Sequence, residues 1–152
     1  MLFHTHIILG IVVFLFFESF FSGGNAVVFF FLVLLGSILP DIDEKHSKIN
    51  RWTGIIGIII AFFFKHRGLF HSVVLHGSLF VLLWKFFDFY YGAALFLGYF
   101  AHLLGDGITR MGVPIFYPFS NWKIRGPVRV GGWMEGVIFF LLFVLIVKIL
   151  FS

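Results

Sequence analysis

The stretch TGIIGIIIAFFF, residues 53–64, decides how this chain is expected to fold. It is apolar enough to enter a bilayer, but its twelve residues would rise only about 18 Å as an α-helix. A helix that crosses a typical hydrocarbon core needs about 20 residues. We therefore expect residues 53–64 to form a short re-entrant or interfacial helix that does not cross the membrane.

The composition of the chain indicates an integral membrane protein. Its 152 residues are 61% hydrophobic and 12% charged, and the mean hydropathy is +1.07. An ordinary soluble domain carries about 25% charged residues. No polar linker separates the apolar runs, so we predict one membrane-embedded domain over residues 1–152. The absence of cysteine excludes thiolate metal ligands, disulfides and cysteine nucleophiles.

Five further apolar runs are candidates for membrane-crossing helices. The first is expected to remain as a membrane helix rather than to act as a signal peptide, because no Lys or Arg precedes it and no small-residue cleavage site follows it. With the short segment 53–64, these runs predict an all-α bundle of about five transmembrane helices. The predicted helices lie at residues 6–21, 26–39, 72–87, 91–106 and 133–151.

The positions of the eleven lysines and arginines favour five crossings over six. If all six runs cross, five basic residues lie on the N-terminal face and six on the other, which predicts no orientation. If residues 53–64 do not cross, nine share the N-terminal face and only Lys85 and Lys148 lie opposite. Because cytoplasmic loops carry an excess of Lys and Arg, we expect a multi-pass cytoplasmic (inner) membrane protein with its N-terminal face in the cytoplasm.

The same topology brings most of the ionisable residues to one membrane face. Such residues are costly at membrane depth and usually mark a functional site. Glu18 and Lys85 lie away from this face and are expected to form a structural ion pair, and His76 is expected to be a packed histidine. The residues that converge are His4, His6, Asp41, Asp43, His46, His66, His71, His102, Asp106 and Glu135.

Two motifs carry the carboxylates of this face. In HLLGD, residues 102–106, His102 and Asp106 are four residues apart and share a helical face, so both can bind one metal ion, or the pair can simply pin two helices together. In LPDID, residues 39–43, Asp41 and Asp43 follow a helix-ending proline. In an extended segment both carboxylates would enter one site; the alternative is a solvated helix end.

Basic and terminal motifs complete the face. KHRGLFHS, residues 65–72, places His66, Arg67 and His71 around a turn, where Arg67 can hold an anion beside a helix N-terminus or anchor the chain at anionic headgroups. HTH, residues 4–6, offers two imidazoles at the start of the first helix. Glu135 begins the last helix, where a carboxylate is also a favourable capping charge.

This inventory is typical of a hydrolytic metal site. Histidines and carboxylates bind the ion, which lowers the pKa of a bound water, while a carboxylate can act as general base and an arginine can stabilise negative charge. No nucleophile elbow, phosphate-binding loop or dinucleotide fingerprint is present, and no nucleic-acid partner is expected. Two alternatives remain: a metal-ion or proton transport protein, because His and Asp also line ion pathways, and a membrane protein with a structural metal.

Four motifs in order resemble the YdjM-like membrane-bound metal-dependent hydrolases, a family similar to zinc-dependent phospholipase C and the single-strand nucleases. They are GSILPDID (36–43), HRGLFHS (66–72), GYFAHLLGDGITRMGVP (98–114) and PFSNWKIRGP (118–127). In that family a histidine often follows the second aspartate directly, whereas here Glu44 follows Asp43 and His46 comes two positions later.

The resemblance implies roles for individual residues. A divalent metal, with zinc expected and manganese as the alternative, would bind one or more sites made by His6, Asp41, His71, His102 and Asp106. Catalytic or substrate-binding roles fall to Asp43, His66, Arg67 and Glu135. The expected substrate is a phosphoester, and a site at headgroup level in the cytoplasmic leaflet points to a membrane lipid.

Overall fold

The computed structural model describes residues 1–151, and over this range the chain is helical without β-strands. This confirms the predicted all-α fold, and the helix ends lie within four residues of the predicted ones. The α-helices are α1 (Phe3–Phe17), α2 (Ala26–Ile38), α3 (Lys48–Trp52), α4 (Ile55–Phe63), α5 (Val73–Phe86), α6 (Phe89–Gly107) and α7 (Trp133–Phe151). Three short 3₁₀-helices are η1 (Glu18–Phe20), η2 (Leu39–Asp43) and η3 (Leu69–His71).

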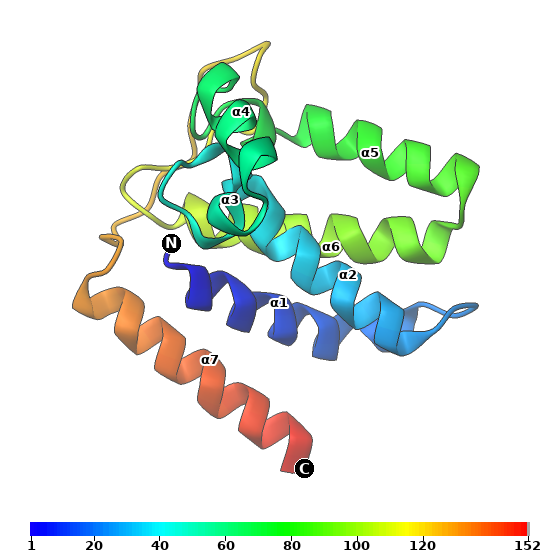
Figure 1. Ribbon diagram of the computed structural model, residues 1–152. Coiled ribbons are helices and arrows are strands. Elements are labelled where there is room, and N and C mark those ends of the chain that lie inside the picture. The colour runs from blue at the N-terminus through cyan, green and yellow to red at the C-terminus, as the bar shows by residue number, and fades with distance from the viewer. Residues whose placement is uncertain (152) are drawn as a thin grey trace.

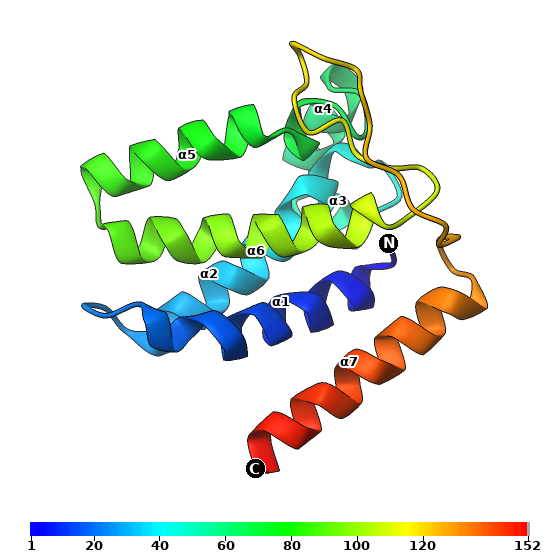
Figure 2. The ribbon, with the colours of Figure 1, turned by 180° about the vertical axis from the view of Figure 1, so that it is seen from behind.

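Helices α1, α2, α5 and α6 form the bundle, with α6 packed against the other three (Figure 1). The short elements α3, α4, η2 and η3 gather at one end of this bundle, beside the start of α1. The loop between α6 and α7 lies at the same end, and α7 contacts α1 while diverging from the rest (Figure 2). One end of the bundle therefore collects most of the irregular backbone.

Three helical segments are long and apolar enough to cross a membrane: Phe3–Phe20, Ala26–Asp43 and Trp133–Phe151. Helix α5 is apolar but has 14 residues, and α6 has 19 residues with polar side chains in its last turns. These lengths agree with an α-helical membrane protein, while the count of five crossings stays a prediction. The nine-residue α4 lies at the end of the bundle and not within its row of long helices (Figure 1).

Three features differ from the sequence-based expectations. Residues 39–43 are not extended but form η2, and the short helix α3 was not predicted. Glu18 and Lys85 form no ion pair within residues 1–151, so that prediction is wrong; Glu18 lies in η1 and Lys85 in the last turn of α5. His76 is buried and stacks on Tyr99 with 3.6 Å between ring centroids, as expected for a packed histidine.

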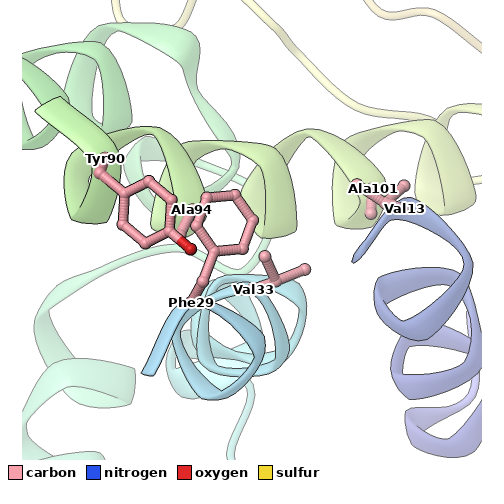
Figure 3. Close-up of a cluster of buried hydrophobic side chains, with 6 residues drawn as sticks. All are labelled: Val13, Phe29, Val33, Tyr90, Ala94 and Ala101. Atoms are coloured by element: carbon pink, nitrogen blue, oxygen red, sulfur yellow. The ribbon is translucent and has the colours of Figure 1, made fainter. Parts of the chain in front are cut away.

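The core between α2 and α6 depends on two glycines. Phe29 and Val33 of α2 pack against Tyr90 and Ala94 of α6, while Val13 of α1 faces the same helix (Figure 3). Near this cluster the two backbones touch: a Cβ on Gly98 would lie 1.9 Å from the carbonyl oxygen of Val33, and a Cβ on Gly36 would lie 2.2 Å from that of Leu95. Small residues permit such close helix contacts in membrane proteins.

Replacing Gly98 with alanine is therefore expected to force α2 and α6 apart. Overpacking of this kind costs roughly 1–3 kcal/mol, so the midpoint of thermal unfolding in detergent should fall by several degrees. Gly77→Ala is the matched control, because a Cβ there meets nothing within 4 Å. Equal melting curves for the two variants would contradict the close contact.

Candidate metal centre

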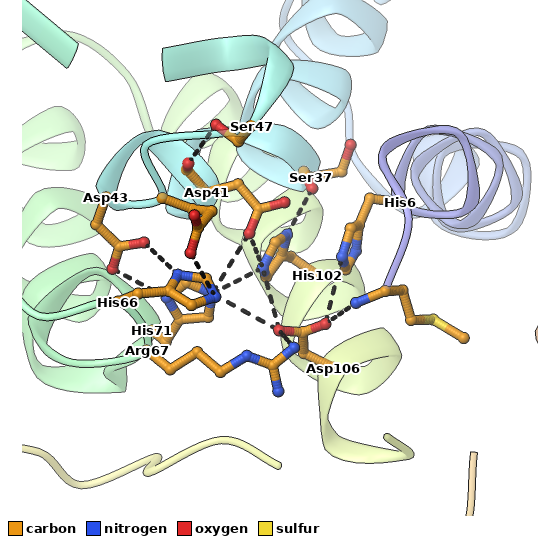
Figure 4. A network of polar contacts seen from close by, with 12 residues as sticks. His6, Ser37, Asp41, Asp43, Ser47, His66, Arg67, His71, His102 and Asp106 are labelled. Carbon is orange, nitrogen blue, oxygen red and sulfur yellow. Dashed lines mark hydrogen bonds and ion pairs between the residues drawn. The ribbon is translucent and has the colours of Figure 1, made fainter. Parts of the chain in front are cut away.

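Imidazoles and carboxylates meet at the end of the bundle that holds the irregular backbone (Figure 4). Helix α1 supplies His6, η2 supplies Asp41, η3 supplies His71, and the last turns of α6 supply His102 and Asp106. His6, His71, His102 and Asp106 are fully buried. The predicted ligand residues thus come from four separate elements and lie together.

Four atoms outline a site for one ion. The Nε2 atoms of His71 and His102 are 3.2 Å apart. Asp41 Oδ1 lies 3.7 Å from His71 Nε2 and 3.8 Å from His102 Nε2, and Asp106 Oδ2 lies 3.7 and 4.0 Å from the same two atoms. Two ligand atoms on a tetrahedral zinc ion stand about 3.4 Å apart. His71, His102 and Asp106 therefore present grouped donors of the right chemistry for a divalent ion, and Asp41 faces the same two imidazoles.

The outer nitrogens of both imidazoles face oxygen atoms of neighbouring residues. His102 Nδ1 lies 2.8 Å from the carbonyl oxygen of Ser37, and His71 Nδ1 lies 3.4 Å from Asp43 Oδ2. Such contacts to the outer nitrogen orient a metal-binding histidine and leave Nε2 free for the ion. The side chains are therefore already turned toward a common centre.

The two aspartates of LPDID do not enter the site side by side, as an extended segment would require. In the 3₁₀-helix η2 they diverge, so Asp41 faces His71 Nε2 and Asp43 faces His71 Nδ1. Asp43 also bonds His66, with 2.8 Å between Oδ1 and Nδ1. Asp41 thus belongs to the donor set, while Asp43 bridges His71 and His66 behind it.

His6 lies on the side of His102 that faces away from His71 (Figure 4). Their rings stack with 3.9 Å between centroids, and His6 Nε2 is 3.4 Å from Asp106 Oδ1. Neither nitrogen of His6 makes a hydrogen bond of good geometry, although the side chain is fully buried. A buried polar group without a partner calls for an explanation, and a ligand role for His6 provides one, since its nitrogen also groups with Asp41 and His102 within 4.8 Å.

Arg67 is buried and makes contacts inside the protein. Its guanidinium lies 2.7 Å from Asp106 Oδ2 and donates to the Gly112 carbonyl at 2.8 Å and to Thr109 Oγ1 at 3.2 Å. Its backbone has φ +59°, in the left-handed region that is uncommon outside glycine. Arg67 therefore ties Asp106 to the loop after α6, and the anion-binding role expected from the sequence stays a prediction.

Charge in the site is balanced within a buried network. Burial alone would lower the pKa of His71, but the adjacent carboxylates of Asp41 and Asp43 raise it to about 9. Asp106 also accepts from the α-amino group of Met1. The buried carboxylates are therefore neutralised by surrounding positive groups, and a divalent cation would neutralise them in the same way.

The remaining predicted residues lie around the cluster. His66 is partly exposed, with its Nε2 3.6 Å from Glu44, and it can group with Asp41 and His71 around an ion. Glu135 accepts from the backbone amides of Leu2 and Gly131 at 2.6 and 2.7 Å. Its carboxylate thus anchors the start of α1, and its catalytic role stays a prediction. His4 and His46 are exposed and belong to none of the ligand groups.

Several contributors were not singled out from the sequence. Ser37 acts through its main-chain oxygen, which no residue type reveals, although its place one turn before Asp41 in GSILPDID was visible. Thr109 accepts from Arg67 and donates to the carbonyl of Asp106 at 2.7 Å, three residues after that aspartate. These residues support the ligands and depend on contacts between distant parts of the chain.

A cavity of about 460 Å³ opens over the cluster. Asp41, His66 and Arg67 line one side, and the remaining lining comes from residues 1–3, residues 44–51 and the loop between α6 and α7. Asp41, with 16% of its side chain exposed, is the ligand candidate that reaches this space. The cavity therefore meets the donor set at Asp41.

Fold and site together define a helical membrane protein with a buried histidine–aspartate cluster that could hold a metal. The model of the YdjM inner membrane protein family matches residues 1–151, and the chain belongs to this family. The resemblance to YdjM proteins seen in the sequence is thereby confirmed, and membership places the chain among inner membrane proteins.

Relatives are known from several bacteria. The inner membrane protein YdjM of Escherichia coli K12 is 34% identical over 125 residues, which cover 73% of this chain and 61% of that protein, and YdjM of Shigella flexneri gives the same values. The uncharacterized protein YvsG of Bacillus subtilis is 30% identical over 112 residues, covering 68% and 66%. The chain thus spans less than two thirds of these relatives. No solved structure matches.

The contact between Asp43 and His71 gives a test of the donor set. Asp43→Asn keeps the shape of the side chain but removes the charge that orients His71, so zinc affinity should fall about 10–100-fold. Affinity is measured by competition with a chromogenic chelator. Glu18→Gln, which removes a carboxylate from the other end of the bundle, should leave it unchanged. Equal affinities for wild type and Asp43→Asn would contradict the orienting role.

Proposed function

We propose that this protein is a divalent-metal-dependent hydrolase of phosphoesters in the membrane. The observation that carries the proposal is the spacing of 3.2–4.0 Å between the imidazole nitrogens of His71 and His102 and the carboxylates of Asp41 and Asp106. These residues would hold one ion, with zinc the best match to two nitrogen and two oxygen donors. His6 is the further donor, on the side of Asp106 Oδ1.

A bound metal ion would supply an activated water and neutralise charge on a phosphoryl oxygen. The chain's own groups cover the remaining needs. His66 faces the cavity with its Nδ1 fixed by Asp43, an arrangement that suits a group that accepts and returns a proton. Arg67, also on the cavity wall, holds Asp106 in place through a contact of 2.7 Å with its Oδ2.

The cavity favours catalysis over a purely structural metal. A structural site is closed by four protein ligands, whereas a catalytic ion keeps one position open for water. We propose that this position lies on the side of Asp41, which borders a space of about 460 Å³, so that water can take the place of that carboxylate. Transport across the membrane has less support, because the donor groups lie at one end of the bundle and the buried cluster at the other end is aromatic and aliphatic. Hydrolysis therefore accounts best for both the donors and the space beside them.

A lipid substrate follows from where the cavity would lie. Exposed Trp52 sits in α3 beside it, and aromatic residues of this kind prefer the headgroup level of a bilayer. Across the same end, burial and the nearby cations Arg125, Lys65 and Arg67 lower the pKa of Lys123, so basic side chains are concentrated there. Anionic headgroups are attracted to such a surface. We propose that this end faces the cytoplasmic leaflet.

Metal content is the first test. Elemental analysis of wild type purified in detergent should give stoichiometric zinc or manganese, and the double variant His102→Ala, Asp106→Ala should lose it. His4→Ala is the matched control, because His4 lies two residues before His6 in α1 but is exposed and belongs to none of the ligand groups. Metal retained by the double variant, or lacking in wild type prepared without chelators, would refute the proposed site.

Hydrolysis is then measured on phospholipids in mixed micelles. The metal-loaded wild type should release a phosphorylated or dephosphorylated headgroup, and the metal-deficient double variant should fall to background. Full metal occupancy without turnover of any lipid phosphoester would favour the structural role.

Orientation can be tested with single cysteines, because the chain has none of its own. We expect Lys85→Cys to react with a membrane-impermeant maleimide applied from the extracytoplasmic side, and Arg129→Cys to react only after the membrane is opened. The opposite pattern would place the cluster on the outer face of the membrane.

A further inference from the structure

The cavity over the metal centre has a second wall that the proposed chemistry does not use. Helix α3 forms this wall and places Lys48 and Arg51 along it. Residues three apart on a helix are neighbours on its surface. Both side chains therefore border the same space as Asp41 and His66, from the side away from the donor set.

Helix α3 is held firmly against the segment that carries the aspartates. The side-chain amide of Asn50 donates to the carbonyls of Ile42 and Gly57, both at 2.6 Å. Ser47 caps the helix through Asn50 N at 3.0 Å and donates to the carbonyl of Asp41 at 2.7 Å. The two cations are thus set at a defined place relative to Asp41, rather than on a loose surface loop.

Neither cation has an acidic partner in the protein. Over residues 1–151, Lys48 and Arg51 lie within ion-pair distance of no carboxylate, and Lys48 Nζ instead sits 4.9 Å from the ring centroid of Phe3. The two acids that border the cavity face the imidazoles: Asp41 contacts His71 and His102, and Glu44 contacts His66. Positive charge on the α3 wall is therefore left for something that enters the cavity.

We infer that Lys48 and Arg51 form a subsite for a second anionic group of the substrate. This inference rests on the proposed function and adds the substrate class to it: a phosphoester whose headgroup carries a further phosphate or carboxylate. One phosphoryl group would meet the metal centre beside Asp41, and the second would meet the α3 cations across the cavity. Charge-assisted hydrogen bonds from Lys and Arg are among the stronger polar contacts to phosphate.

The test compares two short-chain lipids that differ by one phosphate. Phosphatidylinositol 4-phosphate and phosphatidylinositol are titrated into the full chain in detergent micelles, and binding is measured directly. Two cations near a membrane surface should favour phosphatidylinositol 4-phosphate, which carries the additional phosphate, by about tenfold or more in affinity. The double variant Lys48→Gln, Arg51→Gln should bind both lipids alike, with unchanged metal content.

The matched control is Lys85→Gln, Lys148→Gln, which also removes two positive charges but lies outside the lining of this cavity. It should keep the preference. A preference that survives in the Lys48→Gln, Arg51→Gln variant, or that is absent in wild type, would overturn the subsite. Free inositol 1,4-bisphosphate separates the two sources of such an anion: affinity equal to that of the lipid indicates a soluble ester, and much weaker affinity indicates a lipid.

Hydrolysis is followed in the same samples, so that the hydrolase function and the subsite of Lys48 and Arg51 can be refuted independently. Binding preference without turnover in the metal-loaded protein would contradict the hydrolase and retain the subsite. Turnover of both lipids at equal efficiency, with equal affinity, would retain the hydrolase and overturn the subsite.

Discussion

Carboxylates that are buried at the end of a membrane bundle must be matched by positive charge, and the rest of the structure follows from this requirement. An ionised carboxylate in a medium of low polarity is strongly unfavourable unless cations and hydrogen-bond donors surround it. Asp106 is fully buried and meets Arg67, His6, His71, His102 and the amino group of Met1. The start of α1, the turn that holds Arg67, η3 and α6 converge here because each brings part of the compensation.

The scaffold positions these groups through contacts between backbones. Helices α2 and α6 approach so closely at Gly36 and Gly98 that no side chain fits between them. This contact brings the end of α2 to α6, where the carbonyl of Ser37 meets His102 and η2 begins. The direction of each imidazole is thus decided several residues away from it, by the packing of two apolar helices.

The helices and the gathering of polar residues were predictable, because hydropathy, basic-residue counting and motif order all depend on local sequence. The conformation of LPDID was not. Asp41 and Asp43 are two residues apart, which would put them on one face of an extended segment. Pro40 and the contacts of Ser47 and Asn50 with this segment instead favour a tight helical turn. The left-handed backbone of Arg67 was equally hidden, since only its distant partners Thr109 and Gly112 explain it.

Helices α6 and α7 differ in how many of their residues are buried. Thirteen residues of α6 are buried, and each side chain there has a defined neighbour. In α7 Glu135 alone is buried, and the rest of the helix is available to lipid. An apolar residue in α7 can therefore be exchanged for another with little consequence, because this helix needs only to be apolar. In α6 each buried side chain must also have the right shape for its neighbours. Sequence drift among related chains should be fastest along α7 and should stop at Glu135.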